Sequence, residues 1–257
     1  MSSTELTRPR PTDRAVRRFA VAWRNRTRRI IRPVAVLDHD IIGYRFQYLP
    51  EVRATVDGFR TFVGFPDVDR IYESARLWPF FDLRIMDRKR PDFGEYIRWL
   101  GLPPDALPLD ILSRSGGEQK GDSVYVAEAP TVAEGGATDY TFLVRGVSYA
   151  LRQHHTTRAA ETLAAGDPLT ILDDPSNEAN PEALLLATTD GARIGWVPDL
   201  LIDYVRRARA HGSRVTVLQN NGPQAPWHAR LLVRLTGHVE PGTEFFTGGD
   251  WPRARLP

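Results

Sequence analysis

The sequence contains no cysteine, and its 257 residues include only two lysines, Lys89 and Lys120. Without thiols the chain forms no disulfide and no cysteine-ligated zinc site, which favours a reducing compartment and predicts a cytoplasmic protein. No apolar run approaches the ~20 residues of a membrane span, and the start of the chain has no hydrophobic segment typical of a secretory signal. The scarcity of lysine also argues against a nucleotide kinase, since no glycine-rich loop precedes a strand lysine and no His-Arg-Asp or Asp-Phe-Gly motif is present.

Residue patterns that carry catalysis or hold metals are missing as well. The sequence shows no Ser/His/Asp order, no His-Glu-x-x-His helix and no paired carboxylates in a recognisable frame. In Asp38-His39-Asp40 the histidine of an extended strand would point away from both acids, so we interpret this segment as a turn. We therefore predict a non-catalytic protein with no cofactor and no metal.

Positive charge is concentrated at the start of the chain. Residues 1–32 hold ten arginines against Glu5 and Asp13, a balance of +8; since the whole chain carries +2, the remaining residues carry −6. Such a segment attracts phosphates or an acidic partner, although an arginine-biased genome would produce the same composition. Because it is also rich in proline up to Pro11, we predict a disordered basic arm over residues 1–18.

Apolar periodicity divides the rest of the chain into two halves. We predict an α+β fold: a small amino-terminal β-sheet with short helices over residues 19–127, and a carboxy-terminal barrel of the OB type over residues 140–239. Residues 128–139 have no periodicity and read as a linker, while the Gly/Pro-rich residues 240–257 are predicted to form an extended tail.

The first half combines predicted strands over residues 19–23, 30–37 and 44–48 with short helices between residues 68 and 113. Pro33 predicts an edge strand or a bulge. The aromatic series at helical spacing is interpreted as core rather than as a nucleic-acid platform; it comprises Trp78, Phe80, Phe81, Phe93, Tyr96 and Trp99.

The order of motifs in this half resembles the amino-terminal subdomain of HipA-type toxin kinases, over residues 34–126. The matching pieces are Tyr44-x-Phe46-x-Tyr48, Gly64-Phe65-Pro66, Pro79-Phe80-Phe81, and Leu112-Ser113-Arg114-x-Gly116-Gly117 running into a strand at 122–126. In that family the subdomain helps to form the antitoxin contact surface, so the resemblance implies a protein partner for this half.

The second half resembles the HIRAN domain over residues 141–238. The matching pieces are an opening strand at 141–149 that ends in Gly146-x-x-Tyr149, a Gly166-Asp167 turn, the loop Asp174-Pro175-x-Asn177, and the closing Ile194-Gly195-Trp196-Val197-Pro198. HIRAN modules occur in helicase-like DNA-repair remodellers and alone in many bacterial proteins. The resemblance implies a barrel that holds the 3′ end of a single DNA strand.

Carried over position by position, the resemblance implies a set of nucleic-acid-binding residues. Tyr149 supports the end nucleotide, Asn177 and Asn180 lie in the loop that receives the terminal hydroxyl, Trp196 follows the closing glycine, and Trp227 lies in a loop whose aromatic stacks on a base. Arg145 of the opening strand completes the set. The chain departs from the family at Asn180, where a carboxylate is usual, and at Ser148, where an arginine is usual.

Two function classes follow from these observations. The first is a non-catalytic nucleic-acid-binding protein that recognises single-stranded DNA ends. The second is a protein-interaction or regulatory module of toxin–antitoxin type, which is favoured by the ten arginines and ten acids that balance over residues 141–240. In the second reading Tyr149 and Trp196 are packing residues of the barrel.

Overall fold

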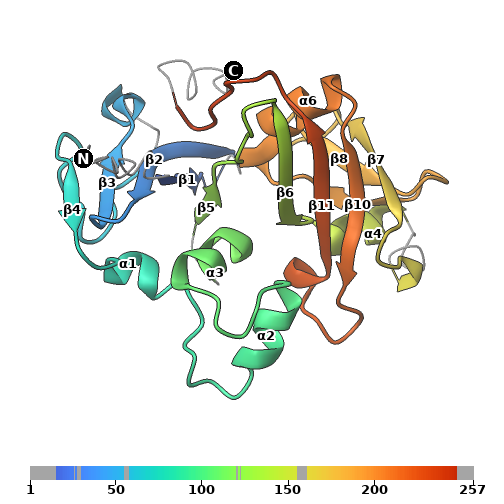
Figure 1. Ribbon diagram of the computed structural model, residues 1–257, viewed down its shortest axis with the longest axis horizontal. Helices are drawn as coiled ribbons and strands as arrows, with labels where there is room; N and C mark the ends of the chain where they lie inside the picture. Colours follow the sequence, from blue (N-terminus) through green and yellow to red (C-terminus); the bar gives the residue numbers. More distant parts are fainter. Residues whose placement is uncertain are drawn as a thin grey trace, which may run out of the picture.

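The computed structural model describes residues 16–25, 27, 30–54, 58–119, 121, 123–154 and 161–247. Most of the predicted basic arm and the last part of the predicted tail therefore lie outside the described residues. The described chain is a mixed α/β structure with two antiparallel sheets, one in each half (Figure 1). No helix within these ranges is both long enough and apolar enough to cross a membrane.

The first sheet has the strand order β4-β3-β2-β1-β5. Its strands are β1 (Arg17–Arg24), β2 (Ile31–His39), β3 (Tyr44–Tyr48), β4 (Tyr72–Ser74) and β5 (Val124–Glu128). The pairing of β1 with β2 shifts register opposite Pro33, between Val21 and Ala22. A proline cannot donate to the ladder, so the bulge predicted at this position is confirmed, and it lies in a central strand.

Three short helices follow the first four strands; the sequence predicts these helices, but not β4, which lies in a stretch expected to be helical. They are α1 (Pro79–Asp82), α2 (Phe93–Trp99) and α3 (Pro108–Ser115), and a 3₁₀ turn η1 (Pro50–Ala54) precedes them. Proline occupies the first turn of α1 and of α3, where its missing N–H costs nothing. All rings of the predicted aromatic series except that of Trp99 pack into two hydrophobic clusters, and Phe81 and Phe93 are buried.

The second sheet has the strand order β6-β11-β10-β7-β8-β9. Its strands are β6 (Ala137–Leu143), β7 (Pro168–Asp173), β8 (Leu184–Ala187), β9 (Arg193–Trp196), β10 (Arg214–Asn220) and β11 (Leu231–His238). Beyond the end of β6, Arg145 and Trp196 exchange two backbone hydrogen bonds of 2.8 Å each. These bonds link the two outermost strands of a sheet that curls into a half-barrel, consistent with an OB-like fold; we refer to it below as the barrel. We call this junction the seam.

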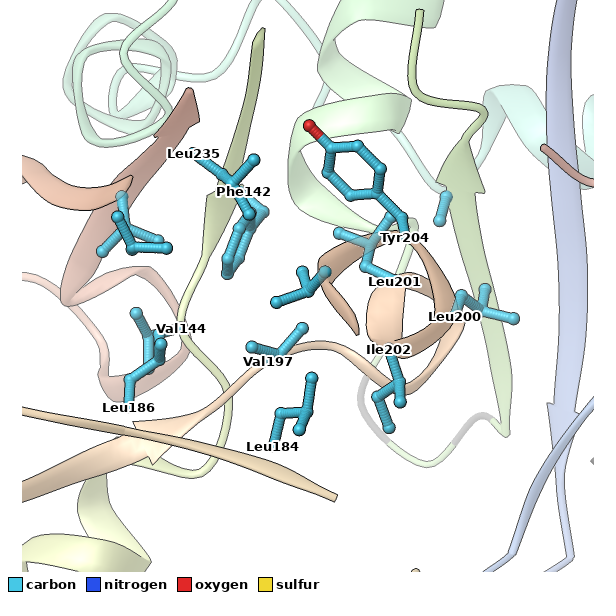
Figure 2. Packing of buried hydrophobic residues seen from close by; sticks show 14 of the residues in the cluster. Phe142, Val144, Leu184, Leu186, Val197, Leu200, Leu201, Ile202, Tyr204 and Leu235 are labelled. Atoms are coloured by element: carbon cyan, nitrogen blue, oxygen red, sulfur yellow. The ribbon is translucent and has the colours of Figure 1, made fainter. Parts of the chain in front are cut away.

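The interior of the barrel is apolar and mainly aliphatic. Figure 2 shows Phe142, Val144 and Leu186 of the barrel wall facing Val197 and the helical segment that follows it. That segment comprises η2 (Asp199–Leu201) and α6 (Ile202–Ala210), and it buries its apolar face against the barrel. The remaining helical elements are α4 (Val147–His154) and the turn η3 (Trp227–Ala229).

The two halves share hydrophobic cores through β1. Side chains of a strand alternate between its faces: Phe19 and Val21 belong to the core of the first sheet, and Ala20 and Ala22 belong to the core of the barrel. A third cluster joins α2 and α3 to Leu143 and Leu232. The connection between the halves is shorter than the predicted linker, because β5 ends at Glu128 and β6 already begins at Ala137.

Candidate functional site

The structure corrects one local prediction at the seam. The strand expected over residues 141–149 ends at Leu143, and Tyr149 lies in the first turn of α4. Gly146 has φ +65°, a conformation that ends strand pairing, and its carbonyl accepts from the backbone N–H groups of Tyr149 and Ala150 at 2.9 and 3.0 Å. The tyrosine is therefore presented by a helix that begins directly after the strand.

Tyr149 and Trp196 form a pair of aromatic rings beside the seam. Their centroids are 5.9 Å apart at an interplanar angle of 44°. Tyr149 is 58% exposed and Trp196 is half-buried. The indole lies against the backbone of Gly146, where a Cβ atom would come 2.7 Å from Cε3 of the tryptophan. A glycine at this position thus allows the strand, the helix and the indole to meet.

A buried carboxylate fixes the indole of Trp196. Its Nε1–H donates to Oδ2 of Asp174 at 2.8 Å, and Asp174 is only 7% exposed. The same carboxylate accepts from the hydroxyl of Ser176 at 2.9 Å and from the amide of Asn177 at 3.5 Å. Burial alone would raise the pKa of this carboxyl, but these hydrogen bonds outweigh that effect and hold its pKa below the ordinary value.

The side chains of Asn177 and Asn180 build the loop between β7 and β8. Oδ1 of Asn177 accepts from the backbone N–H groups of Ala179 and Asn180, both at 3.1 Å. Oδ1 of Asn180 accepts from the backbone N–H of Glu182 at 3.0 Å, and its Nδ2 donates to Asp199 at 2.7 Å. The oxygens of both amides therefore already serve the turn.

The side chain of Arg145 points toward the first half of the protein. Its Nη1 donates to Glu118 at 2.9 Å, and the guanidinium packs over the loop at the end of α3, where a Cβ at Gly116 would come 2.4 Å from Nη2. The backbone of Arg145 makes the two hydrogen bonds of the seam, and its side chain connects the two halves of the protein. The charge of Arg145 is therefore already paired with Glu118 at the surface.

Trp227 lies in η3, which packs against α4. The ring is 43% exposed, and the guanidinium carbon of Arg230 lies 4.2 Å from the ring centroid. Arg230 is itself buried and donates to the carbonyls of Pro223 and Ala225 at 3.2 and 2.9 Å. This cation–π contact orders an exposed indole on a loop next to the helix that carries Tyr149.

Three further residues belong to this surface, and the sequence reasoning did not select them as site residues. Asp174 stands in the quoted Asp-Pro motif, but only the fold reveals its bond to Trp196. Arg152 is exposed and follows Tyr149 by three positions on α4, which places both on one helix face. Arg193 is exposed on β9, and its charge acts on the carboxyl of Asp174.

The turn predicted for Asp38-His39-Asp40 is wrong for its first two residues: Asp38 and His39 end β2 and pair with Arg45 and Tyr44 of β3, and only Asp40 begins the turn. Oδ1 of Asp40 accepts from the backbone N–H groups of Ile42 and Gly43 at 2.7 and 3.2 Å, and Asp38 is paired with Arg18. Across the residues that the structure describes, no group of three or more acidic or histidine side chains is arranged to hold a metal ion.

No family model and no curated protein matches the chain. Among solved structures, the HIRAN domain of human HLTF is similar to it, with a TM-score of 0.30 and 14% sequence identity. The similarity covers 42% of this chain and 84% of that domain. A likeness of this size does not establish a shared site. The implied roles of the site residues, and the resemblance of the first half to HipA-type kinases, stay predictions.

Proposed function

We propose that this protein binds single-stranded nucleic acid at the seam of its barrel and engages the end of a DNA strand, in the manner that the HIRAN resemblance implies. The observation that carries the proposal is the ring pair of Tyr149 and Trp196, in which a buried carboxylate fixes one ring and solvent reaches the other. A tyrosine held only for packing would not need to expose more than half of its surface.

The ring pair suits a base whose identity does not matter. Stacking on an aromatic side chain contributes roughly 1 to 3 kcal/mol per base and tolerates any sequence. Arg152, on the helix face of Tyr149, and Arg193, three residues before Trp196 on β9, are exposed cations that suit the phosphates flanking a stacked base. Trp227 offers a second ring on the neighbouring loop.

For the terminal hydroxyl the proposal assigns Asp174 as the acceptor rather than Asn180. The side-chain oxygens of Asn177 and Asn180 already accept backbone N–H groups. Within the described residues, Oδ1 of Asp174 receives a single hydrogen bond, from the exposed Ser176, and a carboxylate oxygen can accept two. Because its pKa is lowered, this carboxylate is an acceptor at neutral pH.

Fluorescence anisotropy with a short oligonucleotide tests this function. We expect a 3′-hydroxyl strand to bind at least about tenfold more tightly than its 3′-phosphate twin, which brings a negative charge toward Asp174. Tyr149→Ala should weaken binding of both strands by about 5- to 150-fold, the equivalent of one stacked base. Leu83→Ala removes another exposed apolar side chain, from the first half, and serves as the control.

The outcomes separate the general proposal from the specific one. Equal binding of the two strands, still sensitive to Tyr149→Ala, would remove end recognition and leave nucleic-acid binding. Binding that is lost in salt but ignores Tyr149→Ala would report phosphate contacts alone, including those of the arginines near the start of the chain, and would refute the seam as the site.

A protein-interaction role is the second candidate. The balance of ten arginines and ten acids over residues 141–240 gives the barrel no net basic field, and Arg145 is used in a contact between the halves. This candidate includes the regulatory, toxin–antitoxin role that the HipA resemblance implies for the first half. Affinity capture from a cell extract that recovers DNA and no stoichiometric protein would count against it.

A further inference from the structure

A large cleft lies at one end of the first sheet, away from the seam. Its volume is about 1090 Å³, and its walls come from the ends of all five strands of that sheet and from residues 243–247. In Figure 1 this carboxy-terminal segment, in dark red, runs from the barrel toward the first sheet. The start of β6 lies near the cleft, where the carbonyl of Gly136 accepts a hydrogen bond from the backbone N–H of Val239. The seam lies beyond the other end of β6, about 20 Å away, which is the length of its seven residues.

Two of the three arginines that line the cleft, Arg17 and Arg18, are already neutralised. Arg17 donates to Glu128 at 2.6 and 2.9 Å and to Asp110 at 2.8 Å. Arg18 makes a two-pronged pair with Asp38 at 2.7 and 2.9 Å. In each case the bonds to carboxylates, partly opposed by burial, raise the pKa of the guanidinium. These side chains therefore stay charged and paired, and they offer little to an incoming anion.

The charges that remain on the walls are mainly negative. Five acids and three arginines line the cleft. Once the paired residues are set aside, Asp40, Glu73 and Glu244 stand against Arg45. A nucleic-acid phosphate would be repelled from this surface, and a cationic group would be attracted to it.

The cleft also has an apolar rim and the length of a short peptide. Val16 and Ile42 line it and are 53% and 74% exposed. Neighbouring strands lie ~4.8 Å apart, so the ends of five strands span about 19 Å, the length of roughly six residues of extended chain. Alternate side chains of such a chain could contact the acids and the aliphatic rim in turn.

We propose that this cleft binds an extended segment of a partner protein, about six residues long, that alternates arginine or lysine with aliphatic side chains. The inference gives the second candidate function a surface and a partner chemistry. It does not depend on nucleic-acid binding at the seam, because the two surfaces are separate and opposite in their preference for charge.

The test uses the full chain and a fluorescein-labelled hexapeptide of alternating arginine and valine, with two further peptides in which glutamate replaces arginine or serine replaces valine. We expect the arginine–valine peptide to bind most tightly. The pair of substitutions Glu73→Gln and Glu244→Gln should weaken its binding by about tenfold, about threefold for each exposed ion pair. Asp105→Asn, an exposed acid on the loop between α2 and α3, should leave binding unchanged.

Hydrogen exchange provides the second measurement. Peptide binding should slow exchange over residues 38–45 and 243–247, and Tyr149→Ala should not alter the peptide's affinity. Equal binding of the glutamate peptide, an unchanged affinity in the Glu73/Glu244 variant, or protection confined to other parts of the chain would overturn the inference. None of these results bears on the seam, so a failure of one proposal is distinguishable from a failure of the other.

Discussion

The hydrogen bond between the indole of Trp196 and the carboxylate of Asp174 can be measured by a double-mutant cycle. Trp196→Phe keeps an aromatic face and removes the N–H that donates at 2.8 Å, together with one ring of the indole; the double-mutant cycle cancels the packing loss that both backgrounds share. A hydrogen bond to a charged group contributes about 1.5 to 3 kcal/mol. Asp174→Ala leaves the half-buried indole N–H without its acceptor, which costs about 1 to 3 kcal/mol.

Because both substitutions remove the same bond, their effects should not add. We expect the double variant to be more stable than the sum of the single effects predicts, by about 1.5 to 3 kcal/mol, in urea unfolding at pH 7 followed by circular dichroism. Effects that add to within about 0.5 kcal/mol would show that the two side chains do not interact, and the account of the fixed indole would fall.

The coupling energy between Trp196 and Asp174 should also depend on pH. The folded-state pKa of Asp174 is depressed, so its contribution to stability is present above the unfolded pKa and is lost as pH falls through the folded value. The coupling with Trp196 should therefore shrink in acid.

In the same variants, Trp196→Phe should weaken oligonucleotide binding less than Tyr149→Ala does, since a ring remains beside the seam.

Three further substitutions test the packing around the two surfaces, each by urea unfolding against the parent chain. Gly195→Ala should lower the free energy of unfolding by more than about 3 kcal/mol, because φ is +155° and a Cβ would come 2.5 Å from the backbone carbonyl oxygen of Arg145 across the seam. A variant as stable as the parent would contradict the close backbone contact at the seam. Tyr48→Phe should cost about 1 to 3 kcal/mol, because the buried hydroxyl accepts from the N–H of Phe62 at 2.7 Å and donates to the carbonyl of Phe65 at 2.9 Å. Burial raises the pKa of Tyr48 to about 12, so the parent should lose this stability as pH rises from 10 toward 12, and an equal alkaline slope in Tyr48→Phe would refute the assignment. Ala22→Leu should lower the free energy of unfolding by about 1 to 3 kcal/mol, because the larger side chain overfills the contact between the first sheet and the barrel. An unchanged stability would show that Ala22 is not packed in this contact.

Much of the secondary structure follows from local chemistry. The apolar runs of β1 and β2, the apolar alternation of β3, the prolines that begin α1 and α3, and the amphipathic segment after Pro198 are properties of short windows, and the structure confirms each of them. The bulge at Pro33 also follows from local chemistry, because proline lacks a backbone N–H and disturbs the hydrogen-bond ladder in a central strand as well as in an edge strand.

The opening strand of the barrel shows where local reasoning fails. Residues 141–149 are rich in β-branched and aromatic side chains, which favour a strand throughout. The chain instead turns at Gly146, because its backbone must pass under the indole of Trp196, fifty residues further along. Whether a glycine ends a strand or sits within one depends on that distant ring, and no window of sequence contains both.

The site residues divide in the same way. Tyr149, Trp196 and Trp227 could be selected from residue type and motif order, and the structure places the first two in contact and the third on a neighbouring loop. The roles of Asp174 and Arg145 depend on partners 22 and 27 residues away. The sequence therefore indicates which side chains are available, and the fold determines which of them are already engaged.

The contact of Arg145 with Glu118 bears on how the halves work together. The seam closes through the backbone of Arg145, and the side chain of the same residue reaches the loop after α3. That loop also accepts a hydrogen bond from β5, since Val126 donates to the carbonyl of Gly116 at 2.9 Å. A continuous path of hydrogen bonds thus runs from the ring pair to the edge of the first sheet, and β1 adds a shared core. A barrel produced without the first half would lack Glu118, the partner of Arg145, and would expose the core residues that pack against Ala20. The seam is therefore best studied in the full chain.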